Sequence, residues 1–246
     1  MGIIDKESGT RVDEISAGVY RLSTPVPPTA MPGGFTFNQY LLLDEEPLLF
    51  HTGPRRLFSH TRAAISHVMP VERLRWIAFS HVEADECGAL NDLLAAAPHA
   101  APLCSRVAAA VSVTDLADRT PRALSDRETL SLGAKRVTWF DAPHVPHGWE
   151  CGYLLEETTS TLLCGDLFTQ GGHNPAPVTE GDILGPSMHF QKAMDYWAYT
   201  PDTRRQIERL ASTAPTTLAC MHGSAFRGDG AALLRALAEQ VSAPNR

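Results

Sequence analysis

The strongest constraint in this sequence is that a histidine or an aspartate repeatedly follows a short apolar run. His81 ends the segment LRWIAFSH, Asp166 follows LLCG, and His222 follows TTLACM. His144 stands in the same way after VTWFDAP. Short apolar runs between turn residues are typical of buried strands, and a residue just past a strand end is held rigidly beside an open loop. The chain is therefore expected to form sheets whose strand ends carry a polar site.

The same apolar patterns predict the order of strands and helices along the chain. Strands are expected at residues 35–44, 47–53, 74–81, 101–105, 128–143 (a hairpin turning at 133–135), 152–168 (a pair) and 216–223. Helices are expected at residues 54–69, 88–98, 106–117, 201–213 and 229–242. The Gly- and Pro-rich stretches 23–34 and 169–186 are expected to be loops. In each half strands come first and helices follow, which predicts one α/β domain over residues 1–246, with two mixed sheets face to face and helices outside.

Composition excludes several classes of protein. The 246 residues are 43% hydrophobic and 20% charged, which suits a globular protein with a substantial core. The net charge of −7 argues against a nucleic-acid surface. No apolar run reaches the roughly 18 residues of a membrane span. The polar start, MGIIDKESGTRVDEIS, does not resemble a secretory signal, and the five widely spaced cysteines do not suggest disulfides, so a reduced, cytoplasmic protein is expected.

One segment, FSHVEADECGAL, concentrates groups that can bind metal. It holds His81, Glu83, Asp85 and Glu86 within six residues. One interpretation is a solvated helix start, where acidic side chains favour the positive end of the helix dipole. Asp166 can likewise be a plain turn residue after Gly165. The other interpretation is a metal site, because these residues recur in one order with the strand-end residues farther along the chain.

That order resembles the metallo-β-lactamase fold. The segments LLFHTG, FSHVEADECGAL, APHVPHGWECGYLL, LLCGDLF and ACMHG correspond in sequence to the segments that build the metal site of that superfamily. The resemblance extends from about Asn38 to Gly223 and implies a four-layer αββα sandwich. The first segment departs from the pattern, since it carries His51 where the family usually has Asp.

The metal motif itself resembles one branch of the superfamily. The hydrolases normally show H-x-H-x-D-H, whereas this chain shows H-x-E-x-D-E, with Glu83 in place of the second His. That substitution is similar to the flavodiiron proteins and their oxygen-binding di-iron relatives. Glu86 departs from both patterns, because the family usually has His there. The resemblance implies that His81, Glu83 and His144 bind one metal ion and that Asp85 and His222 bind the other. Asp166 would bridge the two ions. Glu86 would either bind the second ion or turn away from it.

The charge of this shell favours iron over zinc. Its four carboxylates carry four negative charges, which two divalent ions already balance. Anionic oxygen stabilises ferric iron and makes a bound water less acidic, which favours redox chemistry over hydrolysis. Manganese and zinc are the alternative metals for this shell. His147, three residues after His144, is the rival ligand, but His144 fits the family's His-x-Pro pattern.

The resemblance implies a di-iron protein that binds or reduces O2 or NO, or senses oxygen. No bound flavin is expected, because no flavodoxin-like sequence follows His222, and turnover would then need an external electron donor. The alternative is a metal-dependent hydrolase of an ester, lactone, thioester or phosphoester. A third interpretation is the same fold with a lost or partial site. The sequence is compatible with a homodimer. Neither nucleic acid nor a membrane is expected as a partner.

Overall fold

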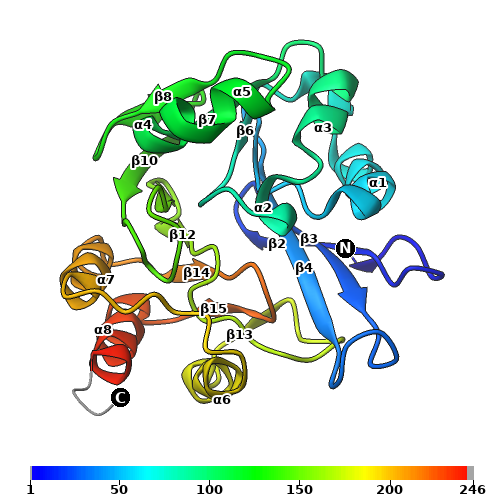
Figure 1. Ribbon diagram of the computed structural model, residues 1–246. Coiled ribbons are helices and arrows are strands. Elements are labelled where there is room, and N and C mark those ends of the chain that lie inside the picture. Colours follow the sequence, from blue (N-terminus) through cyan, green and yellow to red (C-terminus); the bar gives the residue numbers. More distant parts are fainter. Residues whose placement is uncertain (1, 243–246) are drawn as a thin grey trace.

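Two mixed β-sheets face each other in the computed structural model, which describes residues 2–242 (Figure 1). The first sheet runs in chain order: β1 (Gly2–Ile3), β2 (Arg11–Ser16), β3 (Val19–Val26), β4 (Phe35–Leu42), β5 (Leu48–Phe50), β6 (Trp76–Ala78), β7 (Ala101–Ser105) and β8 (Arg122–Leu124). The second has the order β13 (Val178–Thr179), β15 (Ala225–Arg227), β14 (Thr217–Ala219), β12 (Thr161–Leu163), β11 (Gly152–Glu156), β10 (Arg136–Asp141) and β9 (Thr129–Ser131).

Helices cover the outer face of each sheet (Figure 1). The first sheet carries α1 (Phe58–Val68), α3 (Leu90–Ala96) and a segment made of α4 (Arg106–Ala108), a π-helical stretch (Ala109–Val113) and α5 (Thr114–Leu116). The second carries α6 (Leu184–Met194), α7 (Thr203–Ala211) and α8 (Gly230–Val241). The short α2 (Ala84–Cys87) follows β6, and 3-10 turns lie at Arg55–Leu57 and Val71–Arg73.

Three apolar cores hold these layers together. Strand alternation divides side chains between them: Tyr40 and Leu42 of β4 lie in the core between the sheets, while Leu41 lies among the residues that contact α1 and α3. On β10, Trp139 is buried between the sheets and Phe140 packs in the core shared with α7 and α8. Because side chains of a strand alternate between its two faces, each strand contributes to two cores. The predicted αββα sandwich is confirmed.

The topology brings the strand ends that matter to one region. β5, β6 and β7 are parallel neighbours, as are β12 and β14, so their carboxyl ends lie at the same edge of each sheet. His81 follows β6, Asp166 follows β12 and His222 follows β14. The ends of parallel strands are a common place for ligand sites in α/β proteins.

Most predicted elements are present, with three corrections. The stretch 23–34 is not all loop, because β3 continues to Val26 through its full pairing with β4. The predicted loop 169–186 contains β13 and the first turn of α6, a helix that its Gly- and Pro-rich start concealed. The helix expected over 106–117 is broken by the π-helical stretch. In the part of the chain that the structure describes, no helix has the length and apolarity needed to cross a membrane.

Candidate metal centre

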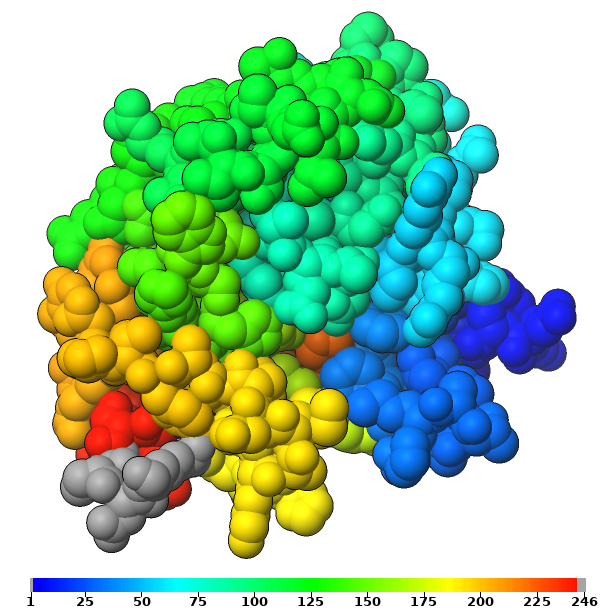
Figure 2. Space-filling model, viewed as in Figure 1, coloured from blue at the N-terminus to red at the C-terminus, as the bar shows by residue number. Residues whose placement is uncertain are grey.

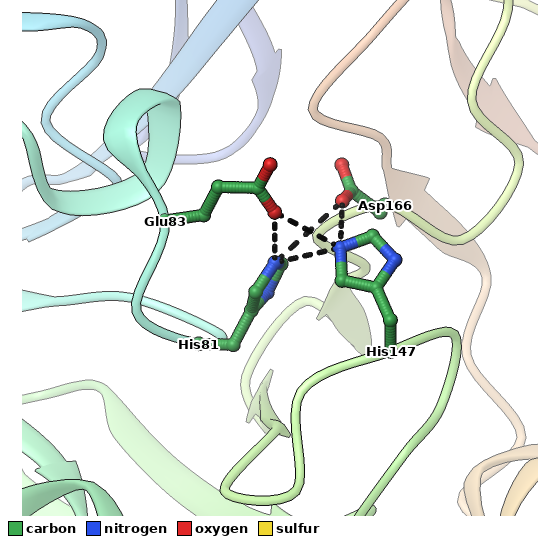
Figure 3. A group of neighbouring side chains, drawn as sticks. All are labelled: His81, Glu83, His147 and Asp166. Carbon is green, nitrogen blue, oxygen red and sulfur yellow. Dashed lines mark hydrogen bonds and ion pairs between the residues drawn. The ribbon is translucent and has the colours of Figure 1, made fainter. Parts of the chain in front are cut away.

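Four side chains from three separate parts of the sequence converge at the edge where β6 and β12 end (Figure 3). Nε2 of His81 and Nε2 of His147 lie 3.0 Å apart. Oε2 of Glu83 lies 3.1 Å from each of these nitrogens. Oδ2 of Asp166 lies 3.3 Å from Nε2 of His147 and 3.8 Å from that of His81. We call these four residues the first group.

A second group of three residues lies beside the first. It consists of Asp85, Glu86 and His222, whose ligand atoms all lie within 4.8 Å of one another. Asp166 joins the two groups. Its Oδ2 faces His147, while its Oδ1 lies 3.2 Å from Nε2 of His222. One carboxylate with an oxygen toward each group has the arrangement of a bridging ligand.

Each histidine of the cluster is oriented by a second hydrogen bond at Nδ1. Nδ1 of His222 lies 2.8 Å from the Thr36 carbonyl oxygen, and Nδ1 of His147 lies 2.9 Å from that of Tyr196. Nδ1 of His81 lies 2.9 Å from Oγ of Ser80. A neutral imidazole that donates from Nδ1 presents an unprotonated Nε2, which is the arrangement typical of metal-binding histidines.

The Ser80 hydroxyl is itself held by a histidine that we did not expect at the site. Nε2 of His51 lies 3.0 Å from Oγ of Ser80 and also accepts from the Ser80 backbone N–H at 3.3 Å. His51 follows β5 and is fully buried, and burial lowers its pKa to about 3. It is therefore a neutral residue that orients Ser80 and, through it, His81. In the sequence His51 follows the apolar run PLLF, and this position at a predicted strand end was the signal that could have pointed to its role.

The Glu86 side chain points into the cluster and not toward solvent. Its side chain is fully buried, and neither carboxylate oxygen has a hydrogen-bond partner among the described residues. Oε2 of Glu86 lies 3.9 Å from Nε2 of His81, so the carboxylate faces the cluster. Burial, reinforced by the charge of Asp166, raises its pKa well above the usual range. A buried carboxylate without a partner is costly unless a cation compensates it.

The hydrogen bonds within the cluster move other pKa values in a consistent direction. Burial would lower the pKa of His147 and His222, but the carboxylates that lie beside them outweigh it and raise these values to about 10 and about 9. Bonds from His147 and His81 lower the pKa of Glu83 to about 2. The protons on these imidazoles compensate the carboxylates of the cluster.

The donor set fits a pair of metal ions. Three imidazole nitrogens and four carboxylates converge, and each imidazole has its other nitrogen already engaged. The oxygens of Glu86 and Oδ1 of Asp166 are buried without a hydrogen-bond partner in the described part of the chain. Mixed imidazole and carboxylate ligands are typical of non-haem iron and manganese sites.

Six of the seven residues expected from the sequence lie in the two groups, and His144 does not. The His144 side chain is exposed and its backbone has a φ of 64°, while its N–H donates to the Gly148 carbonyl at 2.8 Å. Val145, the next residue, is buried, and the Tyr153 hydroxyl donates to its carbonyl oxygen. The chain turns back on itself here, which places His147 rather than His144 over Glu83. The expectation drawn from the His-x-Pro pattern differs from the structure at this position.

Aromatic side chains surround one end of the cluster. The ring of Phe35 stacks on His222 with centroids 4.2 Å apart, and Phe190 of α6 stacks on Phe35 at 5.5 Å. An apolar groove of about 720 Å³, lined by Gly33, Gly171 and Phe190 among others, lies on the outer side of this stack. Figure 2 shows a depression between the teal segment of α2, the yellow α6 and the blue β4, with the orange turn after β14 at its bottom.

The layered fold and its cluster of histidines and carboxylates at the strand ends define a protein of the metallo-β-lactamase fold. A family model described as ODP family beta lactamase matches residues 35–223, and the chain belongs to this family. This match covers β4 through His222, and so contains all members of both groups.

The relatives are flavodiiron proteins and oxygen or nitric oxide reductases. The chain is 29% identical over 212 residues to a rubredoxin-oxygen oxidoreductase of Megalodesulfovibrio gigas, covering 81% of this chain and 51% of that protein. It is 24% identical to a nitric oxide reductase of Moorella thermoacetica, over 83% of this chain and 53% of that one. The flavodiiron core of Flv1 from Synechocystis sp. PCC6803 superposes with a TM-score of 0.80 at 19% identity, covering 95% of this chain and 60% of that one. The chain thus spans about half the length of these curated relatives.

Proposed function

We propose that this protein holds two iron ions in the cluster and uses them to bind or reduce O2 or NO. The observation that carries the proposal is the bridging arrangement of Asp166 between one group of nitrogen-rich donors and another of oxygen-rich donors. His81, Glu83 and His147 would hold one ion, and Asp85, Glu86 and His222 the other. Two ferrous ions there would supply electrons for the reduction of a diatomic molecule.

The residues around the cluster suit this chemistry. The Nδ1 hydrogen bonds of the three histidines fix the orientation of their rings, so that a ligand finds its donors already arranged. The stack of Phe35 on His222 removes water from one side of the cluster.

The hydrolase alternative has less support. Hydrolysis needs a metal-bound water that is acidified by excess positive charge, and the four carboxylates of the cluster cancel the charge of two divalent ions. The named relatives are oxidoreductases. We further propose that the electrons come from a donor separate from residues 2–242, that the cluster needs no bound flavin of its own, and that the protein works in the cytoplasm.

Metal analysis combined with turnover tests the proposal. Protein purified without oxygen from iron-replete cells should contain close to two irons per chain and should consume O2 or NO when a chemical reductant is supplied. Binding of O2 with an absorption change but no consumption would assign a sensor. Zinc at both positions with hydrolysis of an ester would overturn the proposal in favour of the hydrolase.

Glu83→Ala offers a sharper test of the ligand set. Its removal takes away the carboxylate oxygen that lies 3.1 Å from Nε2 of both His81 and His147, so about one of the two irons should be lost. The matched control is Glu72→Ala, an exposed residue in the turn after α1, whose iron content should equal that of the wild type. Unchanged iron in Glu83→Ala would contradict the assignment.

A further inference from the structure

The two groups of the cluster offer different kinds of donor atoms. The first group supplies two imidazole nitrogens, from His81 and His147, and the carboxylate of Glu83. The second supplies one imidazole nitrogen, from His222, and the carboxylates of Asp85 and Glu86. Asp166 contributes one oxygen to each. Counting that shared residue, the first position has two nitrogens and two carboxylates, and the second has one nitrogen and three carboxylates.

Glu86 is the residue that makes the positions unequal, and it is built into the site. Its backbone carbonyl accepts from the Thr52 N–H at 2.7 Å, which fixes α2 against the turn after β5. Its side chain is fully buried, faces His81 at 3.9 Å, and has no hydrogen-bond partner for either oxygen within residues 2–242. A carboxylate held there without a protein partner is free to accept a cation.

Donor type decides which divalent ion a position prefers. Imidazole favours iron, whereas carboxylate-rich sites suit manganese. In general Fe²⁺ binds nitrogen and oxygen sites more tightly than Mn²⁺ does, following the Irving–Williams order. The informative quantity is therefore the Mn-to-Fe occupancy ratio, compared between the two positions of one protein. Replacing one imidazole by a carboxylate should narrow the advantage of iron at that position only.

We propose that the centre is chemically asymmetric. When Mn²⁺ and Fe²⁺ compete, the ratio of bound Mn²⁺ to bound Fe²⁺ is higher at the position formed by Asp85, Glu86, His222 and Asp166 than at the position formed by the first group. This inference rests on the two-metal centre of the proposed function. It adds a difference in metal selectivity between the positions, which the charge balance of the whole cluster does not distinguish. The cation class is a hard, oxygen-preferring divalent ion of high-spin type.

The wild-type protein tests this directly. Metal-free protein is loaded without oxygen in an equimolar excess of Fe²⁺ and Mn²⁺, crystallised, and measured by anomalous scattering on both sides of the manganese and iron absorption edges. We expect the Mn-to-Fe occupancy ratio at the second position to exceed that at the first several-fold. Equal ratios, or a higher ratio at the first position, would overturn the asymmetry while leaving a two-metal centre intact. Metal at neither position would overturn the proposed function as well.

Two variants assign the effect to Glu86. Glu86→His should bring the Mn-to-Fe ratio of the second position close to that of the first, because both positions then offer two imidazoles. Glu239→His, on the exposed face of α8, is the matched control and should leave both ratios unchanged. A wild-type ratio in Glu86→His would overturn the role of this residue.

Glu86→Gln covers the case in which the histidine variant does not fold. The amide has nearly the same size and removes only the charge. Occupancy of the second position by either ion should fall several-fold while the first position keeps its metal. Circular dichroism and thermal unfolding of the metal-free protein monitor folding in each variant. Full occupancy of the second position in a folded Glu86→Gln protein would contradict the proposal.

Discussion

At the scale of single residues, the site depends on which nitrogen and which oxygen each side chain presents. His81, His147 and His222 all engage Nδ1 elsewhere and turn Nε2 inward. Asp166 divides its two oxygens between the groups, and Glu86 is buried with both oxygens unpartnered in the described chain. A site of this kind is arranged before its ions arrive.

The pair His144 and His147 gives the clearest test at this scale. His147→Ala removes a nitrogen that lies 3.0 Å from Nε2 of His81, so metal affinity at the first position should fall about 10- to 100-fold or more. His144→Ala changes an exposed side chain only three residues away and should leave affinity unchanged. Competition with a chelator of known affinity measures both. The reverse result would restore the His-x-Pro assignment.

Sequence patterns located six residues of this cluster because strand ends are marked by an abrupt change from apolar to polar residues. They favoured His144 over His147, since the position of these residues depends on how the ten-residue loop between β10 and β11 turns back over Glu83. His51 and Ser80 were hidden for another reason. Their roles depend on the parallel pairing of β5 and β6, a contact between segments about 30 residues apart.

At the scale of elements, parallel strand pairs and the cores on either side of them bring these residues together. β5 with β6 positions His51, Ser80 and His81, and β12 with β14 positions Asp166 and His222. The apolar alternation predicted most of these strands. It missed α6, because the helix begins at Leu184 inside a Gly- and Pro-rich stretch, and the contact of Phe190 with Phe35 that fixes it is tertiary.

Trp139 on β10 tests how far the core between the sheets supports the fold. Its ring is fully buried, and its indole N–H donates to Asp141 at 2.7 Å. Trp139→Ala should lower the free energy of unfolding by about 3–5 kcal/mol, because it leaves a large cavity. Trp149→Ala, at a ring that is 56% exposed, should change it by less than about 0.5 kcal/mol. Denaturant titration of the metal-free protein measures both, and equal losses would place the main core elsewhere.

At the scale of the whole molecule, we expect metal binding and folding to be coupled through the same ionisable groups. Without metal, protonated His147 and His222 balance the carboxylates, with pKa values of about 10 and about 9. Because both values lie above the usual 6.5, their contribution to stability is complete below pH 6.5 and is lost as the pH rises toward 9 and 10. Metal ions need the unprotonated nitrogens, so binding releases these protons.

The pH dependence of metal binding follows from that competition. Affinity should fall roughly tenfold per pH unit, for each proton displaced, as the pH drops from 9 to 6. The increase in melting temperature on adding metal should therefore be larger at pH 9 than at pH 6, while the metal-free protein alone becomes less stable over the same rise. Thermal scans with and without metal at each pH measure this. An increase that is the same at every pH would show that the histidines do not bind the ions.

The shared carboxylate of Asp166 has a consequence for the order in which the ions enter. Its two oxygens are already divided between His147 and His222 before any ion binds. An ion at one position would leave the second oxygen directed at the neighbouring position. We therefore expect either position to fill without a rearrangement of Asp166, so that neither ion has to enter before the other.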